Sequence, residues 1–314
     1  MSKCLVTGGA GFIGSNLVDE LIKRGDEVVV IDNLSTGKKE NLNPEAEFIE
    51  ADLRDLDKIE PHFENVDYVF HTAALARVQP SIEDPVKYND HNVNGVLNVL
   101  VASKDAKVKK VIYSASSSAY GNNEDGPQSE DMQGVPMSPY GLQKYIGELY
   151  CRLFSLVYKL PTVCLRYFNV YGKNMVLEGA YASVIGIFGK QRMEGKPLTI
   201  VGDGEQKRCY TYVDDIVRAN ILAAESEISD GRAINIGNSK EFTANQIAAM
   251  IGGPTTNIPA RIEPRRNLCD NSLAKKLLNW EPTMNLDKWI VGYKRSWESD
   301  NSRLKIYYLL LIKI

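Results

Sequence analysis

Histidine is scarce in this sequence and positive charge is not in excess, and these two shortages exclude two classes of function. The 314 residues hold three histidines, His62, His71 and His91, without the clustered spacing of metal ligands. We therefore expect no catalytic zinc or other metal site. Lysine and arginine number 37 against 40 aspartate and glutamate residues, which gives a net charge of -3. Because proteins that bind nucleic acid carry a basic footprint, we expect no nucleic-acid partner.

Long apolar runs and paired cysteines are also missing. No run approaches the roughly 20 apolar residues that cross a bilayer, and the start MSKCLVTGGAGF turns glycine-rich at once, unlike a signal peptide. The apolar end IYYLLLIKI, residues 306–314, is too short to span a membrane, and we interpret it as a packing or oligomer-contact segment. Five cysteines without a paired pattern predict reduced thiols. We expect no membrane partner and a cytoplasmic location.

What the first half of the sequence does contain is an alternation of short β-branched runs with helical stretches. Apolar residues recur at helical spacing in 15–24, 93–104 and 140–158, which are predicted helices. Strands that alternate with helices pair in parallel through right-handed crossovers. The predicted fold class is therefore α/β, a Rossmann-type doubly wound parallel sheet. Its strands are predicted at residues 4–7, 27–32, 46–52, 66–73, 109–116 and 162–170.

The pattern changes after Tyr171, where prolines interrupt shorter and less regular pieces. Two later segments still fit the sheet domain, a predicted helix at 213–225 and a strand at 233–236 that rejoins the sheet. We predict a nucleotide-binding Rossmann domain from 1–170 together with 213–236. The smaller C-terminal α/β substrate domain is predicted from 171–212 and 237–314.

The stretch TGGAGFIG at 7–14 follows the first strand and opens the first helix. Gly8 permits a tight turn, Gly11 lets the backbone approach a pyrophosphate, and Gly14 lets helix and strand pack closely. The helix N-terminus then offers free N–H groups and partial positive charge to phosphates. With a strand before it, a helix after it and an acid ending the second strand, this turn predicts a dinucleotide site.

Two acidic positions extend this prediction. Asp32 ends EVVVID, where a carboxylate accepts hydrogen bonds from the ribose hydroxyls and repels a 2′-phosphate. That favours NAD over NADP, although Lys38 and Lys39 lie nearby in the sequence. Asp52 and Leu53 end the third strand and are a candidate adenine contact, with a helix N-cap as the alternative interpretation of Asp52.

SPYGLQK at 138–144 begins a helix in which Tyr140 and Lys144 are four residues apart and share one face. A tyrosine with a pKa near ~10 is a poor base at neutral pH. A neighbouring ammonium and a serine hydroxyl that donates to the phenolate both favour the charged form. Together these groups predict an acid–base device for a substrate hydroxyl beside a nicotinamide.

Over nearly its whole length the chain resembles the extended short-chain dehydrogenases/reductases, and within them the UDP-sugar 4-epimerases of the UDP-galactose 4-epimerase group. The resemblance rests on TGGAGFIGSN (7–16), DNLSTGKKENL (32–42), AD (51–52), HTAA (71–74), SSSAYG (116–121), SPYGLQK (138–144), RYFNVYG (166–172), VGDGEQKR (201–208) and YVDDI (212–216). It implies interconversion of UDP-glucose with UDP-galactose, and of the corresponding UDP-N-acetylhexosamines, with NAD as a retained cofactor.

The catalytic serine implied by the resemblance falls on Ser116 in YSASSSAYG. Ser117 is the alternative, and Ser118 is a further hydroxyl facing the substrate. Related dehydratases and decarboxylases typically carry a glutamate in this segment, whereas here the first carboxylate is Glu124. Without that extra acid or base, epimerisation through a 4-keto sugar is the simplest reaction, with Tyr140 moving the proton and NAD the hydride.

The resemblance also implies the remaining contacts. Arg208 and Arg265 match the arginines of the diphosphate site, and Arg261 and Arg266 compete with Arg265 because this segment is one residue short of the usual pattern. Asn267 falls at the position that sets the size of the sugar pocket, and we expect it to admit both plain and N-acetylated hexoses. The other implied substrate residues are Ser116, Ser118, Asn169, Val184, Thr199, Val201 and Asp270. The implied cofactor residues are Gly8, Gly11, Phe12, Ile13, Gly14, Asp32, Asn33, Ser35, Thr36, Gly37, Asp52, Leu53, Ala73, Ala74, Tyr140, Lys144 and Tyr167.

Three further expectations remain open. Cys209 stands where the family usually has an acid next to its arginine, and we interpret it as a structural cysteine. The resemblance implies a homodimer through a four-helix bundle of 93–104 and 140–158, although the apolar residues of the second helix also fit packing on the sheet. The alternatives in function are a UDP-glucuronate 4-epimerase, a reductase that releases its cofactor, and a non-catalytic sensor of NAD or nucleotide sugars.

Overall fold

The fold is built on a twisted parallel sheet, as the alternating sequence predicts. The computed structural model describes residues 1–122, 126–179, 182–261 and 263–298, so the apolar end 306–314 lies outside the described residues. The sheet has seven strands in the order β11-β6-β5-β4-β1-β2-β3. Its strands are β1 (Lys3–Thr7), β2 (Glu27–Asp32), β3 (Glu47–Glu50), β4 (Tyr68–His71), β5 (Lys110–Ser116), β6 (Thr162–Tyr167) and β11 (Asp230–Ile236).

The strand order reverses between β1 and β4, because β2 and β3 extend the sheet to one side of β1 and later strands extend it to the other. The neighbouring pairs are parallel, with Thr7 opposite Ile31 on β2 and opposite His71 on β4. In such sheets ligands bind beyond the carboxyl ends of the strands at the point of reversal. The loops that follow β1, β2, β4 and β5 therefore enclose the expected site.

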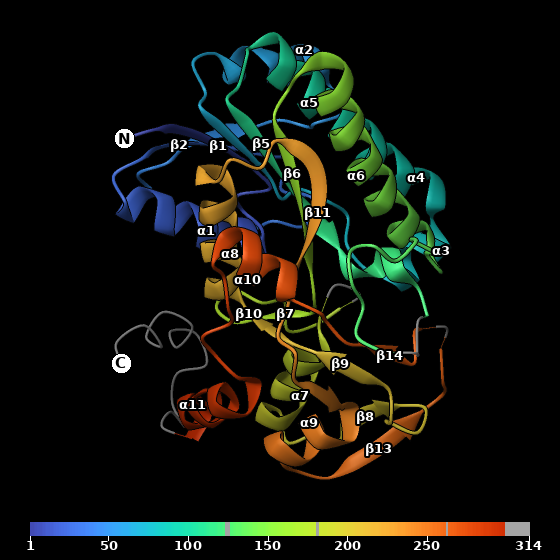
Figure 1. Ribbon diagram of the computed structural model, residues 1–314. Helices are drawn as coiled ribbons and strands as arrows, with labels where there is room; N and C mark the ends of the chain where they lie inside the picture. Colours follow the sequence, from blue (N-terminus) through green and yellow to red (C-terminus); the bar gives the residue numbers. More distant parts are fainter. Residues whose placement is uncertain (123–125, 180–181, 262, 299–314) are drawn as a thin grey trace.

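Helices cover both faces of the sheet (Figure 1). One face packs against α1 and α8 in a core that includes Leu17, Phe70 and Ile216. The other face packs against α5 and α6 in a core that includes Phe63, Val99 and Tyr113. Both cores arise because the central strands are apolar on both sides. The helices of this part are α1 (Phe12–Lys23), α2 (Leu56–Ile59), α3 (Val78–Glu83), α4 (Pro85–Asn89), α5 (Gly95–Asp105), α6 (Pro139–Tyr158) and α8 (Val213–Glu225), with short turns η1 (Lys39–Asn41), η2 (Glu60–Phe63), η3 (Asp90–Asn94) and η4 (Ser117–Tyr120).

Shorter elements form a second cluster beneath the carboxyl ends of the sheet (Figure 1). Its core holds Tyr171, Phe188 and Ile247 among other apolar side chains. Strands pair here as β10 with β7, β13 with β8, and β12 and β14 on either side of β9. The elements are β7 (Val170–Tyr171), α7 (Val184–Met193), β8 (Leu198–Val201), β9 (Lys207–Cys209), β10 (Thr211–Tyr212), β12 (Glu241–Thr243), α9 (Ala244–Ile251), β13 (Thr255–Ile258), β14 (Arg266–Asn267) and α11 (Leu286–Glu298). Helix α10 (Ser272–Leu278) lies between β14 and α11 in the sequence but packs elsewhere.

The structure departs from the expected elements at the ends of three strands and at one domain boundary. Strand β3 ends at Glu50 and β4 spans Tyr68–His71, so the predicted strands 46–52 and 66–73 are too long, and Asp52 and Leu53 lie in the loop after β3 rather than at its end. The predicted strand at 162–170 ends at Tyr167, and β7 begins only at Val170 after Asn169 turns with a φ of 29°. Helix α10 and Trp280 pack on the sheet side, although the predicted boundary assigns them to the substrate domain: the Trp280 indole donates to the Asp215 carbonyl at 2.8 Å. The division into two domains otherwise stays a prediction.

Candidate active site

The glycine turn joins β1 to α1 with very little space around its backbone. Gly8 has a φ of 74°, and a Cβ there would lie 2.7 Å from the Ala73 backbone. A Cβ on Gly14 would lie 2.2 Å from the Gly8 carbonyl oxygen. Helix α1 begins with Gly11 as its N-cap and without a side-chain cap. Its first N–H groups, with the positive end of the helix dipole, are left for a phosphate.

Asp32 lies at the end of β2, and its carboxylate joins this turn to the loop that follows β2. Its Oδ2 accepts the N–H of Ala10 at 3.0 Å, and its Oδ1 accepts the N–H of Leu34 at 2.8 Å. Burial raises the pKa of the carboxyl group, while these two backbone donors lower it. Each oxygen keeps a further lone pair, so the fixed carboxylate fits the ribose hydroxyls of a dinucleotide.

Asp52 is held by side chains rather than by a helix. It accepts the Nε of Arg54 at 2.9 Å and the Nδ2 of Asn33 at 2.8 Å, and the side-chain hydrogen bond from Arg54 is the main cause of its lowered pKa. Helix α2 begins after Asp55, which is its N-cap. The alternative in which Asp52 caps a helix is therefore wrong. Asp52 and Leu53 both line the cavity described next.

A cavity of about 840 Å³ runs from the glycine turn to the second cluster of elements. The structure brings most of the predicted residues to its wall. The lining includes, of the predicted cofactor residues, Gly8, Gly11, Phe12, Ile13, Gly14, Asp32, Asn33, Ser35, Thr36, Asp52, Leu53, Ala73, Ala74, Tyr140 and Tyr167, and, of the predicted substrate residues, Ser116, Ser118, Asn169, Val184, Thr199, Val201, Arg208 and Asn267. The lining does not include Gly37, Lys144, Arg265 or Asp270.

The turn η4 that follows β5 gives the serines of the serine-rich stretch different surroundings. Ser116 is the N-cap of this turn, and its Oγ accepts the N–H of Ser118 at 3.2 Å and the Oγ of Ser118 at 2.8 Å. Ser117 is buried and points to Asn267, with its Oγ 3.5 Å from Oδ1. Ser116 also faces the phenol of Tyr140 and lowers its pKa. The structure thus brings Ser116, and not Ser117, to the tyrosine.

Tyr140 lies in the first turn of α6, whose N-cap Ser138 accepts the N–H of Gly141 at 3.1 Å. Burial raises the pKa of its phenol above the usual value. The two groups that lower this pKa are Ser116, through its hydrogen bond, and the guanidinium of Arg77. Arg77 follows β4 and is a residue that the sequence analysis missed.

Lys144 lies one turn further along α6 and is only 4% exposed. Its ammonium donates to the Ser114 carbonyl at 2.7 Å and lies 4.9 Å from the centre of the Tyr113 ring. Burial lowers the pKa of this group to about 8. Lys144 is therefore placed behind the cavity wall and hydrogen-bonded to the end of β5.

The arginines expected at a diphosphate are separated by the structure. Arg208 lines the cavity and donates to Glu263 at 3.1 Å and to the Pro264 carbonyl. Arg265 lies outside the lining, is 51% exposed along its side chain, and pairs with Asp203 at 2.7 Å. Arg261 lines the cavity in its stead. Of the competing candidates, the geometry favours Arg261 over Arg265.

Asn267 lies on β14 and is buried between two other side-chain amides, those of Gln128 and Asn169. Its Nδ2 donates to Gln128 Oε1 at 2.8 Å, and its Oδ1 accepts the Nδ2 of Asn169 at 3.1 Å. Asp270 lies beyond these amides, where its carboxylate accepts the N–H of Ser272 at 2.9 Å. Gln128 is a second residue that the sequence analysis missed, because only the folded chain brings it to β14.

Cys209 is fully buried beside Tyr120 and Phe168. Burial raises the pKa of its thiol to about 12. It is therefore a neutral packing residue in this structure. Within the described ranges, histidine, cysteine and acidic side chains do not gather into a group that could hold a metal ion. No described helix combines the length and apolar character needed to cross a membrane.

Comparison with known proteins places this geometry in a family. The model of the NAD dependent epimerase/dehydratase family matches residues 4–237. A relative from Methanocaldococcus jannaschii, named as a putative UDP-glucose 4-epimerase, is 38% identical over 95% of this chain and 99% of its own length. The structure of the UDP-glucose 4-epimerase of Thermotoga maritima with UDP-glucose is 41% identical, with a TM-score of 0.89, and covers 94% of this chain and 97% of its own.

A second solved structure shows a different bound sugar. The UDP-N-acetylglucosamine 4-epimerase of Methanobrevibacter ruminantium, in complex with UDP-N-acetylmuramic acid, is 38% identical with a TM-score of 0.88, and it covers 95% of this chain and 97% of its own. Similar proteins thus share the fold and carry sugars of different size.

Proposed function

This chain belongs to the NAD dependent epimerase/dehydratase family, and from that premise we propose that it is a 4-epimerase of UDP-hexoses. The cofactor is NAD, as for the family, and the wall of the cavity fits it. Gly14 leaves no room for a side chain between helix and turn, the N-terminus of α1 has no side-chain cap, and Asp32 is held beside the turn. These features suit a pyrophosphate and a ribose.

The observation that carries the proposal is the chemistry around Tyr140. Ser116 reaches its phenol, and the segment from Ala115 to Asn122 offers hydroxyl and amide groups but no carboxylate. Elimination of water or loss of carbon dioxide calls for a further acid or base near the carbon skeleton. An alcohol that is oxidised and then reduced again needs only one group that accepts and returns a proton.

Tyr140 is that group in the proposed mechanism. Its phenolate takes the proton of the sugar 4-hydroxyl, and Ser116 donates a hydrogen bond that favours the phenolate. The glycine turn, the N-terminus of α1 and Asp32 would hold NAD, which would supply a hydride acceptor for C4 and a hydride donor for the opposite face of the 4-keto sugar once the sugar has turned over in the cavity. Tyr140 then gives the proton back to O4, so protein and cofactor end the cycle as they began it.

Substrate recognition follows from the other end of the cavity. Arg208 and Arg261 lie on its wall, and arginine forks suit the oxygens of a diphosphate. Val184, Thr199 and Val201 line the part where we place the uracil. Asn267 is fixed between Gln128 and Asn169 and gives this wall a polar, medium-sized side chain. We propose UDP-glucose and UDP-galactose as substrates, with the N-acetylhexosamine pair also admitted.

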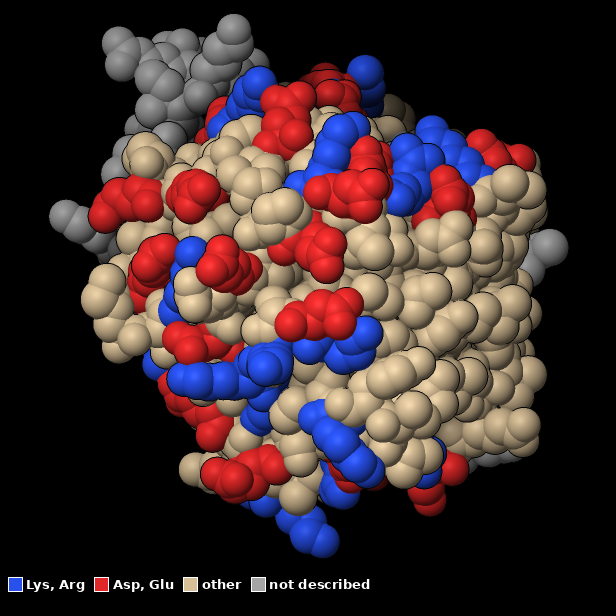
Figure 2. Space-filling model, turned by 90° about the horizontal axis from the view of Figure 1, so that it is seen from above, with Lys and Arg blue, Asp and Glu red and all other residues tan. Residues whose placement is uncertain are grey.

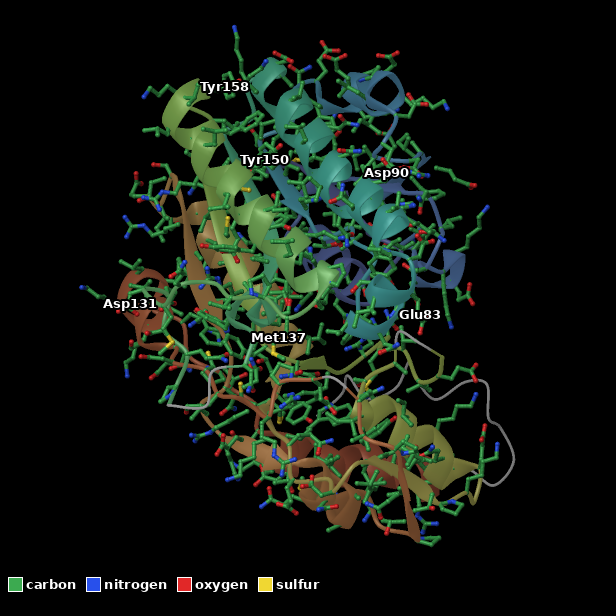
Figure 3. The ribbon with its side chains drawn as sticks, turned by 90° about the vertical axis from the view of Figure 1, so that its right-hand side faces the viewer. Glu83, Asp90, Asp131, Met137, Tyr150 and Tyr158 are labelled. Atoms are coloured by element: carbon green, nitrogen blue, oxygen red, sulfur yellow. The ribbon has the colours of Figure 1, made fainter. Side chains whose placement is uncertain are left out.

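The proposed assembly is a homodimer through α5 and α6. Six residues of α6 are apolar and 44–69% exposed: Leu142, Leu149, Leu153, Leu156, Val157 and Tyr158. Figure 3 shows α5 and α6 side by side on this face, with Tyr150 and Tyr158 on the upper half of α6. This face is on the right-hand side of Figure 2, which shows few charged residues there. Apolar surface of this extent is typical of an interface.

Sedimentation equilibrium tests the dimer. A mass of two chains is expected for the natural protein, and Leu153→Glu on α6 should reduce it to one. Val291→Glu is the matched control, because Val291 is a comparably exposed apolar residue on α11 and should leave the mass at two chains. A mass of one chain for the natural protein would contradict the proposal.

The activity is tested by incubating the purified protein separately with UDP-glucose, UDP-N-acetylglucosamine and UDP-glucuronate, without added cofactor, and following the H4 and anomeric signals by NMR. We expect 4-epimers from the first two sugars, formed at least about 10² times more slowly by the Tyr140→Phe protein. Epimerisation of UDP-glucuronate alone would support the glucuronate alternative. If no sugar changes even after NAD is supplied, the epimerase proposal fails.

A further inference from the structure

Arg77 has a backbone conformation that a side chain rarely adopts. Its φ is 89° and its ψ is 144°, a region that is costly for any residue other than glycine. Side chains of α4 and η3 hold the two residues that precede Arg77. Asn92 accepts the N–H of Leu75 at 2.8 Å and donates to its carbonyl at 2.9 Å, and the Tyr88 hydroxyl donates to the Ala76 carbonyl at 3.0 Å. Strain that is held in this way is often kept for function.

The strained residue lies on the wall of the cavity that also contains Tyr140. Arg77 and Tyr140 line the same cavity, and Arg77 directly precedes α3. The Ser81 hydroxyl on α3 accepts the backbone N–H of Tyr140 at 3.1 Å, so α3 is joined to the first turn of α6. Figure 3 shows Glu83, at the end of α3, and Met137, just before α6, both near the lower end of α6.

The charged and titratable groups around these two residues come from several elements. Ser116 and Arg77 both lower the pKa of Tyr140. Tyr140 in turn contributes to the raised pKa of Tyr113 on β5. Arg77 interacts in turn with Tyr140, Tyr88 and Arg261. Lys144, on α6 itself, directs its ammonium to the Ser114 carbonyl. Of these groups, Arg77 is the cation that lowers the pKa of the Tyr140 phenol, while burial lowers the pKa of Arg77 itself.

We propose that Arg77 is a positioning residue that acts through Tyr140: its guanidinium stabilises the phenolate that accepts the proton from the sugar. The guanidinium stays charged throughout the working pH range. A cation close to a phenolate in a desolvated cavity interacts more strongly than it would in water. The inference deepens the proposed function, since it assigns the electrostatic support of the proposed base.

The test compares four proteins: natural, Arg77→Lys, Arg77→Ala and Arg77→Gly. The alanine variant removes the cation and keeps the strain, whereas the glycine variant removes both. Two readouts are taken on the protein with its retained cofactor. One is the ionisation of Tyr140, measured as the near-ultraviolet difference titration against Tyr140→Phe. The other is the pH dependence of kcat for UDP-glucose epimerisation.

We expect the Tyr140 titration and the acidic limb of kcat to move to higher pH by about one unit in both Arg77→Ala and Arg77→Gly. Arg77→Lys keeps a cation at this position, so its titration should lie close to that of the natural protein. Arg77→Gly should nevertheless melt at a higher temperature than Arg77→Ala. Lys107, which is exposed and has a φ of 56°, provides the control: Lys107→Gly against Lys107→Ala should reproduce the melting difference with no change in either titration.

Two outcomes would overturn the inference. One is an unmoved Tyr140 titration in the alanine and glycine variants. The other is a raised KM with an unmoved acidic limb, which would make Arg77 a residue that binds the sugar rather than one that supports the base. If the natural protein epimerises no UDP-hexose, the proposed function fails, but the titration of Tyr140 still decides the role of Arg77.

Discussion

Acidification should lower the free energy of unfolding because one buried imidazole, that of His71, resists protonation in the folded protein. This side chain ends β4 and is 2% exposed. Its Nδ1 lies 2.7 Å from the Thr7 hydroxyl, and its ring stacks on Tyr113 with 5.7 Å between the centroids. Burial, followed by the charge of Lys144, lowers its pKa from 6.5 to about 3. The folded protein therefore holds this histidine neutral.

The sign and size of the effect follow from linkage. Below pH 6.5 the unfolded chain binds a proton on His71 that the folded chain does not bind until the pH approaches 3. The unfolded state binds more protons within this window, so the free energy of unfolding falls as the pH falls. At pH ~5 the loss is about 2 kcal/mol, and it reaches about 5 kcal/mol at the lower end of the window.

Urea unfolding at several pH values between about 7 and about 5 measures this loss, with His71→Asn as the reference. Asparagine keeps a polar group near Thr7 but does not titrate. We expect the natural protein to lose about 2 kcal/mol more than the variant over this range. Carboxylates that titrate in both proteins cancel in the difference. Two parallel stability curves would refute the reasoning, because they would mean that His71 does not resist protonation in the folded state.

Three further predictions concern the core and the site. Glu148→Gln should cost about 3–5 kcal/mol in urea unfolding, because it leaves Arg166 buried without the carboxylate that it contacts at 2.6 Å; a double change of both residues to methionine should recover most of the loss, and a single-variant cost under ~1 kcal/mol would contradict this. Gly14→Ala should release NAD on gel filtration, because its Cβ would lie 2.2 Å from the Gly8 carbonyl; full NAD content in the variant would count against the assigned turn. Tyr140→Phe should lower kcat by a factor of about 10²–10⁴ with NAD content unchanged. A kcat equal to that of the natural protein would exclude Tyr140 as the proton acceptor.

The sheet and its long helices could be predicted because their signals are local. Helix α8 spans Val213–Glu225, as its apolar spacing predicts, and β2 ends at Asp32. Helices α3 and α4 were missed because each has six residues or fewer, which is too short for a helical repeat to be visible. Pieces such as β14, with two residues, have no sequence pattern at all. They exist because their partners lie elsewhere in the chain.

The site shows the same division between local and distant information. Ser116, Tyr140 and the glycine turn lie within motifs whose spacing fixes their geometry. Arg261 and Arg265 lie in an irregular segment where no repeat sets which side chain turns inward, and the structure directs Arg265 to Asp203. The exposed apolar face of α6 is another such case. Leu153 fits packing on the sheet by its spacing, yet it lies 44% exposed, because Phe154 and Cys151 occupy the sheet-facing side.

The surroundings of Tyr140 explain why a tyrosine and a lysine four residues apart do not by themselves define a base. The spacing places Lys144 on the same face of α6, but burial lowers its pKa to about 8 and its ammonium is hydrogen-bonded to Ser114. Burial lowers the pKa of Arg77 as well, but a guanidinium starts from a much higher pKa than a lysine and keeps its charge. A second cation from a different element can therefore support the phenolate where the lysine alone is weakened. On the proposal that Arg77 supports the base, its positive φ is a cost that the loop after β4 bears at a residue on the cavity wall.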